Sequence, residues 1–132
     1  MYKVIILAHG SQNNDDRDLS LIIKKLSELL NKEAYQITLA YLKHGNPSIN
    51  QVINHFLDKN TKQVIVHPFF LSSGTHVTRD IPKIIEKIKE KYPHIEVICT
   101  EPLGKNKNLA YIIKELINEA IVKQTKRNYL NL

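Results

Sequence analysis

The chain has 132 residues and a formal net charge of +6, and its length fits one domain with a real hydrophobic core. Its 42% hydrophobic and 24% charged residues exclude a disordered or a fibrous protein. The positive charge fits nucleic acid, an anionic membrane surface or an acidic small molecule, and charge alone does not distinguish these partners.

The cysteine content and the lengths of the apolar runs indicate the cellular compartment of the protein. The single cysteine, Cys99, cannot form an internal disulfide, which indicates a reducing compartment. The N-terminal apolar run ends in His9 and Gly10 instead of a small-residue cleavage site, so it predicts a strand and not a signal peptide. No apolar stretch reaches the roughly 20 residues that a membrane helix needs. We therefore expect a cytoplasmic protein with no membrane partner.

The first half of the chain predicts two pairs of a strand and a helix. Residues 4–8 and 37–42 are apolar or β-branched runs, typical of strands covered on both faces. After each run, apolar side chains recur with helical spacing. They are Leu19, Ile22, Ile23, Leu26, Leu29 and Leu30 in one helix, and Ile49, Val52, Ile53, Phe56 and Leu57 in the next. Pro47 with Ser48 fits the start of the second helix.

The second half repeats this pattern. Residues 64–66, continuing toward residue 71, and residues 95–100 predict the third and fourth strands. The apolar stripes of the last two helices are Ile81, Ile84, Ile85 and Ile88, and Leu109, Ile112, Ile113, Leu116, Ile117, Ala120 and Ile121. Asp80 before Pro82 fits the start of the third helix. Each of the four helices is expected to pack by one face.

The alternating order predicts the fold class. It indicates a single α/β domain with a four-stranded parallel sheet, right-handed crossovers and helices on both faces. We expect this domain to cover residues 1–122. Residues 123–132 lose the helical periodicity but keep Lys123, Lys126 and Arg127, so they predict a basic C-terminal tail.

Histidines follow several of the predicted strands. In an open parallel sheet the ligand site lies beyond the carboxyl ends of the strands. Three of the six histidines, His9, His44 and His76, fall on that edge. Histidine is a common ligand of divalent metals and a base near neutral pH, so the clustering predicts a site. Small residues flank His9 and His76 and let a ligand approach the backbone, which favours these two.

Other candidate features have simpler interpretations. His55 and His94 are expected to be solvated, and His67, inside the third strand, to be packed or hydrogen-bonded. No glycine-rich phosphate loop follows the first strand, and the spacing around Ser11 and Ser73 shows no catalytic triad. The lysines are spread along helix faces with few aromatic residues among them, so we expect no nucleic-acid partner.

Four segments together resemble a known family. Residues 66–82 read VHPFFLSSGTHVTRDIP, and residues 7–11 read LAHGS; NPS follows at 46–48 and EPLG at 101–104. These segments resemble the short form of the sirohydrochlorin chelatases, class II chelatases that insert cobalt, nickel or iron into a tetrapyrrole. The pattern of glycine, histidine and Asp-Ile-Pro after an apolar strand is the most specific part, and the resemblance covers nearly the whole chain.

The resemblance implies a chelatase-like three-layer α/β/α fold and a homodimer with the site between subunits. It implies a lyase with no organic cofactor, whose substrates are Co²⁺, Ni²⁺ or Fe²⁺ and sirohydrochlorin or a related acidic tetrapyrrole of cobalamin or siroheme biosynthesis. His9 and His76 match the metal-binding histidines of the family, with His9 as proton acceptor. The implied macrocycle contacts are Asn46, Phe70, Leu71, Ser72, Ser73, Gly74 and Thr75.

The chemistry of metal insertion is consistent with this pair of histidines. Two pyrrole N–H protons must leave while a hydrated ion sheds water and enters the ring. A neutral imidazole binds borderline ions such as Co²⁺ and also accepts a proton. Two histidines leave coordination positions open for delivery. Candidates to pair with the carboxylates of the ring are Lys43, His44, Arg79 and Lys105, for which surface solvation is an equal alternative.

The chain departs from the family at two positions. Lys43 stands where the family commonly has a glutamate, and Asn46 where it has an acidic residue before the proline. These departures favour a second hypothesis, a tetrapyrrole or metal carrier that binds without catalysis. A third hypothesis is an unrelated α/β binding module whose positive charge binds nucleic acid. Its signature would be an affinity for DNA that falls steeply with salt concentration.

Overall fold

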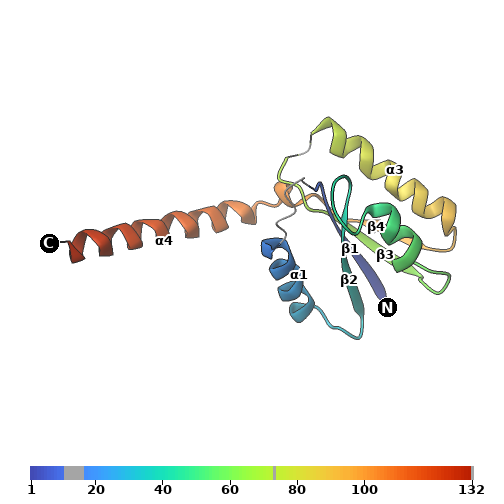
Figure 1. Ribbon diagram of the computed structural model, residues 1–132, viewed down its shortest axis with the longest axis horizontal. Helices are drawn as coiled ribbons and strands as arrows, with labels where there is room; N and C mark the ends of the chain where they lie inside the picture. Colours follow the sequence, from blue (N-terminus) through green and yellow to red (C-terminus); the bar gives the residue numbers. More distant parts are fainter. Residues whose placement is uncertain (11–16, 73, 132) are drawn as a thin grey trace.

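The computed structural model describes residues 1–10, 17–72 and 74–131, with the backbone alone at residues 75–78. Strands and helices alternate along the chain in the predicted order (Figure 1). The strands are β1 (Tyr2–Ala8), β2 (Tyr35–Tyr41), β3 (Gln63–Pro68) and β4 (Glu96–Cys99). The helices are α1 (Arg17–Leu29), α2 (Ile49–Gln51), the π-helical turn η1 (Val52–Phe56), α3 (Thr75–Lys91), the 3-10 turn η2 (Leu103–Lys105) and α4 (Asn108–Leu130).

The four strands form one parallel sheet in the order β2-β1-β3-β4, which confirms the predicted α/β fold. β1 lies in the middle and pairs with both β2 and β3, so Tyr2 lies beside Tyr35 on one side and Gln63 on the other. Because all four strands run in the same direction, their carboxyl ends share one edge of the sheet. The segments that follow the strands therefore meet at this carboxyl edge.

The main hydrophobic core lies on the face of the sheet that α2, η1 and α3 cover. Ile5 and Leu7 of β1 and Val64 and Val66 of β3 are fully buried there. These side chains alternate with residues of the opposite face, as the two-residue period of a strand requires. The covering helical segments contribute Ile49, Val52, Ile53, Ile84 and Ile88 to the same cluster.

The two helices over this core begin differently from each other. α2 starts as predicted, because Ser48 Oγ accepts a hydrogen bond from Gln51 N (3.2 Å) and Ser48 N donates to Gln51 Oε1 (2.8 Å). The predicted start of α3 near Asp80 is wrong, since the helix begins at Thr75 and contains Pro82. Pro82 is exposed, so water can bond the backbone carbonyl that the proline leaves without its helical partner.

The opposite face of the sheet is covered in part by α1. Val4, Ile6 and Ala8 of β1 are buried on this side, where α1 lies against β2 (Figure 1). β3 and β4 present Ile65, His67 and Ile98 on the same face by the alternation of their side chains. Among the residues that the structure describes, no helix lies over this β3–β4 half, and Ile98 is 37% exposed.

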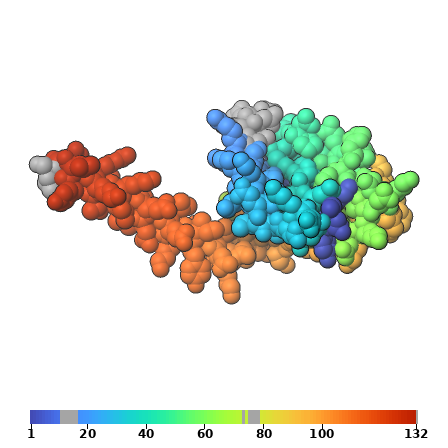
Figure 2. Space-filling view, turned by 90° about the horizontal axis from the view of Figure 1, so that it is seen from below, coloured from blue at the N-terminus to red at the C-terminus, as the bar shows by residue number. Residues whose placement is uncertain are grey.

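The last helix, α4, projects away from the sheet instead of packing on it (Figures 1 and 2). Every side chain of residues 110–131 is exposed, so the expectation that this helix packs by one face is not met within the described part of its own chain. The helix continues to Leu130, and the predicted basic tail is therefore helical over residues 123–130. In the described parts of the chain, no helix combines the length and the apolar character that crossing a membrane requires.

Candidate functional site

The turn after β1 is packed against the segment after β2. His9 O accepts a hydrogen bond from Lys43 N at 3.0 Å. Gly10 has a φ of +93°, and a Cβ at this position would lie 2.4 Å from Lys43 O and 2.5 Å from His44 O. Both the left-handed conformation and the lack of space favour glycine here. The sequence Leu-Ala-His-Gly therefore brings His9 beside Lys43 and His44 at the carboxyl edge.

The side chains of these three residues face solvent. His9, Lys43 and His44 are all exposed, so each of the two imidazoles and the ammonium group is accessible to a ligand. The ammonium group of Lys43, a residue whose backbone is bonded to that of His9, attracts anions such as carboxylates. This part of the edge thus combines possible metal ligands with a positive charge.

The segment after β3 continues the pairing of the two central strands beyond their ends. Phe69 N donates a hydrogen bond to Leu7 O at 2.8 Å. Phe70 is buried in the fold, whereas Leu71 is 75% exposed and Ser72 is also exposed. Of these predicted macrocycle contacts, Leu71 and Ser72 are accessible to a ligand and the side chain of Phe70 is not.

The rest of this segment leads into α3. Gly74 occupies the N-cap position of α3, and no atom would lie within 4 Å of a Cβ added to it. Thr75 and His76 form the first turn of α3, which follows β3 at the carboxyl edge. The structure describes only the backbone of these two residues. Ser73 lies wholly outside the described residues. The backbone thus places His9 directly after β1 and His76 in the helix that follows the neighbouring strand β3, and their pairing around a metal stays a prediction.

The turn η2, which follows β4, holds this segment in place from the other side. Gly104 N donates a hydrogen bond to Phe70 O at 2.8 Å, and a Cβ on Gly104 would lie 1.8 Å from Leu71 O. Glu101 Oε2 and Lys105 Nζ form an ion pair at 3.6 Å on the surface of the same turn. Lys105 therefore has a partner within its own chain, in addition to being a candidate for substrate carboxylates.

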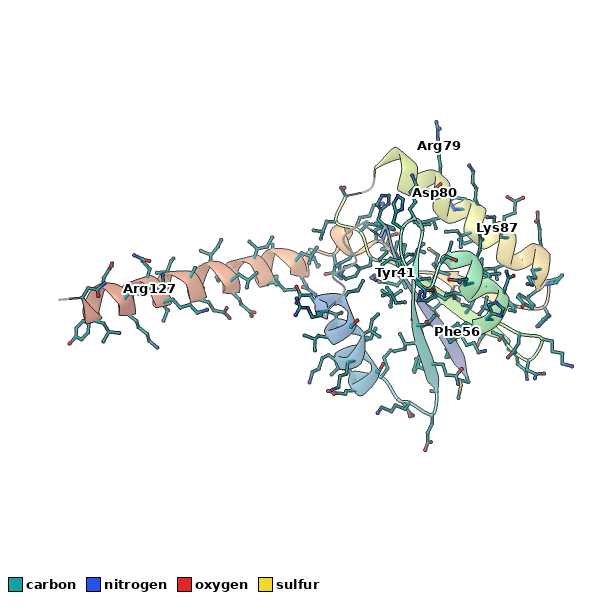
Figure 3. All side chains as sticks on the ribbon, in the orientation of Figure 1. Tyr41, Phe56, Arg79, Asp80, Lys87 and Arg127 are labelled. Carbon is teal, nitrogen blue, oxygen red and sulfur yellow. The ribbon has the colours of Figure 1, made fainter. Side chains whose placement is uncertain are left out.

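Two other predicted residues, Asn46 and Arg79, have different surroundings. Asn46 lines a pocket of about 300 Å³ together with Pro47, Gln51 and His55 beside β2. Arg79 is exposed on α3 and points away from the sheet (Figure 3). His55 is exposed as expected, and it lines the pocket of Asn46.

His67 of β3 is hydrogen-bonded to Thr100, the residue directly after β4, which confirms the prediction of a packed or hydrogen-bonded residue. Its Nδ1 lies 2.7 Å from Thr100 Oγ1, which itself donates to Glu101 O at 3.1 Å. A hydroxyl group has one proton, so Nδ1–H of His67 donates to Thr100 and Nε2 carries the lone pair. Burial lowers the pKa of His67 and thereby favours this neutral form.

A pocket of about 410 Å³ lies next to His67 at the base of α4. It is lined by His67, Glu101, Pro102, Leu103, Lys105, Asn106, Lys107 and Asn108. The sequence singled out Lys105 as a candidate but not Lys107 and Asn108. The only feature of the sequence that points to these two residues is their position between the last predicted strand and the last predicted helix.

Metal binding at the edge depends on few ligands. Within the described residues, no group of three His, Cys, Asp or Glu side chains could hold a metal ion. The predicted pair of His9 and His76 is a two-ligand site, and it needs no such cluster. Such a site suits transient delivery of an ion better than permanent storage.

The parallel sheet and the histidine turn at its carboxyl edge together define a chelatase-like α/β protein. Residues 3–120 match the model of the CbiX family. The chain therefore belongs to the CbiX family.

Known proteins of this kind are similar along almost the whole chain. A sirohydrochlorin cobaltochelatase of Sulfurisphaera tokodaii is 29% identical over 126 residues, covering 96% of this chain and 99% of that protein. The crystal structure of a putative cobalamin biosynthesis CbiX protein from Marinobacter aquaeolei has a TM-score of 0.72 at 27% identity, covering 93% of this chain and 99% of the other.

A more distant structure shows the same fold. The sirohydrochlorin chelatase SirB from Bacillus subtilis subspecies spizizenii, solved in complex with cobalt, has a TM-score of 0.73 at 17% identity. The match covers 89% of this chain and 50% of the SirB chain. The chain thus spans half the length of SirB.

Proposed function

We propose that this chain inserts a divalent metal into sirohydrochlorin, with Co²⁺ as the first candidate and Ni²⁺ or Fe²⁺ as alternatives. The reaction is that of a lyase in tetrapyrrole biosynthesis of the cobalamin or siroheme type, with the metal as substrate and no organic cofactor. Similarity over 96% of the chain to a relative named sirohydrochlorin cobaltochelatase supports this function. The observation that carries the proposal is the His9 turn, which Gly10 packs against Lys43 and His44 at the carboxyl edge.

In this proposal His9 and His76 hold the incoming ion and His9 accepts a proton from a pyrrole nitrogen. Imidazole nitrogens suit Co²⁺, Ni²⁺ and Fe²⁺, and two protein ligands leave positions for water and then for the ring nitrogens. The close contact of Gly10 with the segment after β2 holds the backbone of His9 in one place. The imidazole thus starts from a fixed backbone when ring and ion arrive.

The macrocycle would lie across the segments that follow β2 and β3. Its proposed contacts are Asn46, Phe70, Leu71, Ser72, Ser73, Gly74 and Thr75, with Phe70 contributing through its backbone because its side chain is buried. Lys43 and His44 would pair with carboxylates of the ring, since they lie beside His9. Arg79 is the weaker candidate for this role, because it points away from the sheet (Figure 3).

We further propose that the chain is a cytoplasmic homodimer whose chelatase domain covers residues 1–122, with residues 123–132 as a basic extension. A ring-shaped substrate is large compared with the carboxyl edge of one four-stranded sheet. A second copy would supply the opposite wall of the site.

The experiment that tests the function measures metal insertion over many turnovers. Sirohydrochlorin and Co²⁺, each in large excess over protein, are followed anaerobically by absorbance, with heat-denatured protein as the control for spontaneous insertion. A chelatase converts many equivalents of the ring faster than the control does.

The alternative function is a carrier that binds without catalysis, which Lys43 and Asn46 favour because they replace carboxylates. A carrier would give a spectral change that stops at one equivalent of ring per site. That result would overturn the proposed reaction and leave ring binding intact.

A further inference from the structure

α4 carries apolar side chains that nothing covers among the described residues. Ile112, Leu116 and Ile117 of its predicted stripe are 51%, 58% and 54% exposed. Tyr111 and Val122, on the other side of the helix, are exposed as well. Monomeric soluble proteins rarely present so long a continuous apolar surface to water. The helix is therefore expected to be buried against a partner surface.

The same chain has an uncovered strip of sheet that is one helix wide. The strip consists of the β3–β4 half of the face on which α1 lies, with Ile65, His67 and Ile98 on its surface. The connections from β2 to β3 and from β3 to β4 place their helices on the core face, and only α1 returns to the other face in the described part of the chain. A sheet in an α/β protein is covered on both faces, so the strip lacks one helix.

The chain between β4 and α4 directs the helix away from its own strip. Gly104 N is bonded to Phe70 O, and Leu71 O occupies the space that a Cβ on Gly104 would need. Asn106 N donates to Leu103 O at 3.1 Å, and the first turn of α4 follows within two residues. The short, bonded connection leaves little freedom for α4 to turn back, and the helix leaves the molecule as a straight extension (Figure 1).

We infer that α4 of each chain covers the β3–β4 strip of a second copy, so that two copies exchange their last helices. The inference rests on the homodimer proposed above and specifies how that dimer is built. Each copy offers one helix and one strip, so two copies satisfy both surfaces in a closed, two-fold symmetric arrangement.

The dimensions and charges of the two surfaces agree with this exchange. The 23 residues of α4 extend over about 34 Å, whereas the 6 residues of β3 extend over about 20 Å, so the helix spans the strip completely. A helix that runs antiparallel to the strands, as in α/β folds, brings Lys123 about 22 Å along the strip. This position is level with Glu96 at the amino end of β4, which offers a carboxylate to the basic end of α4.

A crosslinking experiment on the full-length chain tests the exchange directly. In a background in which Cys99 is replaced by serine, Ile98→Cys on the strip and Leu116→Cys on α4 are introduced together and treated with a short bis-maleimide. We expect a covalent dimer on a denaturing gel, while each single-cysteine chain serves as a control for accidental links. A link within one chain, or no link, would overturn the exchange.

Measurement of the oligomeric state by light scattering provides the second test and requires no crosslink. Leu116→Glu places a charge on the buried stripe and is expected to convert the dimer to a monomer, whereas Asn118→Glu on the other side of the same helical turn is expected to remain dimeric. A dimeric Leu116→Glu variant would contradict the exchange. A monomeric wild-type chain would refute the homodimer itself, and neither result depends on chelatase activity, which is measured separately.

Discussion

His9 is the residue on which the proposed chemistry depends most, and its position is set by its neighbours along the backbone. The hydrogen bond from Lys43 N to His9 O and the contact of Gly10 with the carbonyl groups of Lys43 and His44 anchor the turn. The imidazole itself is exposed and can meet a ligand. A rigid backbone with an accessible side chain is the arrangement that a metal-delivering base requires.

We expect His9→Ala and His76→Ala each to lower the rate of Co²⁺ insertion by about 10²-fold or more, because each substitution removes a proposed metal ligand and His9→Ala also removes the proposed base. Initial rates measured anaerobically, with far-ultraviolet circular dichroism to verify folding, check this expectation. His94→Ala, at an exposed position after α3, is the matched control and should retain the wild-type rate. An unchanged rate for His76→Ala would remove this residue from the site.

The surroundings of His67 determine its protonation state. It donates from Nδ1 to Thr100 Oγ1, and burial lowers its pKa below the ordinary value of 6.5. The folded state thus disfavours the protonated ring, whereas the unfolded chain accepts the proton at the ordinary pKa. The contribution of neutral His67 to the free energy of unfolding is therefore complete above pH 6.5. It is lost as the pH falls from 6.5 through the lowered pKa of the folded state.

We therefore expect the free energy of unfolding to decrease as the pH is lowered below about 6.5, and His67→Asn to weaken this dependence. Urea unfolding at several pH values and constant protein concentration checks it. His94→Asn leaves the bond between His67 and Thr100 intact and should show the wild-type dependence. If His67→Asn behaves in the same way as His94→Asn, the pH dependence originates elsewhere.

At the scale of elements, the candidate site is built by segments that continue the strand pairing beyond the strands. Phe69 N bonds to Leu7 O after β3, and Lys43 N bonds to His9 O after β2. Parallel order brings these segments to one edge, and close backbone contacts at Gly10 and Gly104 hold them together. The loops of the site are thus supported by the sheet.

We expect Gly10→Ala to destabilise the fold by about 1–3 kcal/mol, because alanine at a φ of +93° is strained and its Cβ would meet Lys43 O. The displaced turn should also lower the insertion rate. Gly74→Ala is the matched control for stability alone, since its Cβ would meet open space and its φ of −68° suits any residue. Denaturant unfolding compares the two variants, and equal stability would show that the His9 turn tolerates a side chain.

At the scale of the whole molecule, the net charge of +6 and the free helix α4 are the two features that concern partners. The positive charge suits an acidic tetrapyrrole, and Lys43 places part of it beside His9. Figure 2 shows α4 as an arm outside the body of the molecule, which is consistent with contact to another copy. The positive charge thus supports the proposed substrate, and the exposed helix α4 supports the proposed dimer.

We expect the KM for sirohydrochlorin to rise with sodium chloride concentration while kcat changes little, because salt screens the attraction between the basic surface and the carboxylates of the ring. Steady-state kinetics between low and physiological ionic strength check this. Sucrose at equal osmolality is the control for effects of the solute that do not involve charge. A KM that is independent of salt would mean that charge has no part in substrate capture.

Much of the fold and part of the candidate site could be predicted from local patterns. Apolar runs such as residues 4–8 predicted the strands, and the spacing in segments such as Leu109 to Ile121 predicted the helices. The parallel order of the strands then placed His9 and His44 on one edge. The start of α3 was mispredicted, because Asp80 and Pro82 are local signals that occur within a helix as well as at its beginning.

The sequence by itself determined which segments form strands and helices and which histidines follow the strands, because the spacing of apolar residues acts through neighbours in the chain. Only the tertiary structure decided that Phe70 is buried, that His67 bonds to Thr100, and that Gly10 fits only without a side chain. It also decided that α4 leaves its own sheet, since an apolar stripe predicts burial but does not specify the surface. These features depend on contacts between residues far apart in the chain, which no local pattern encodes.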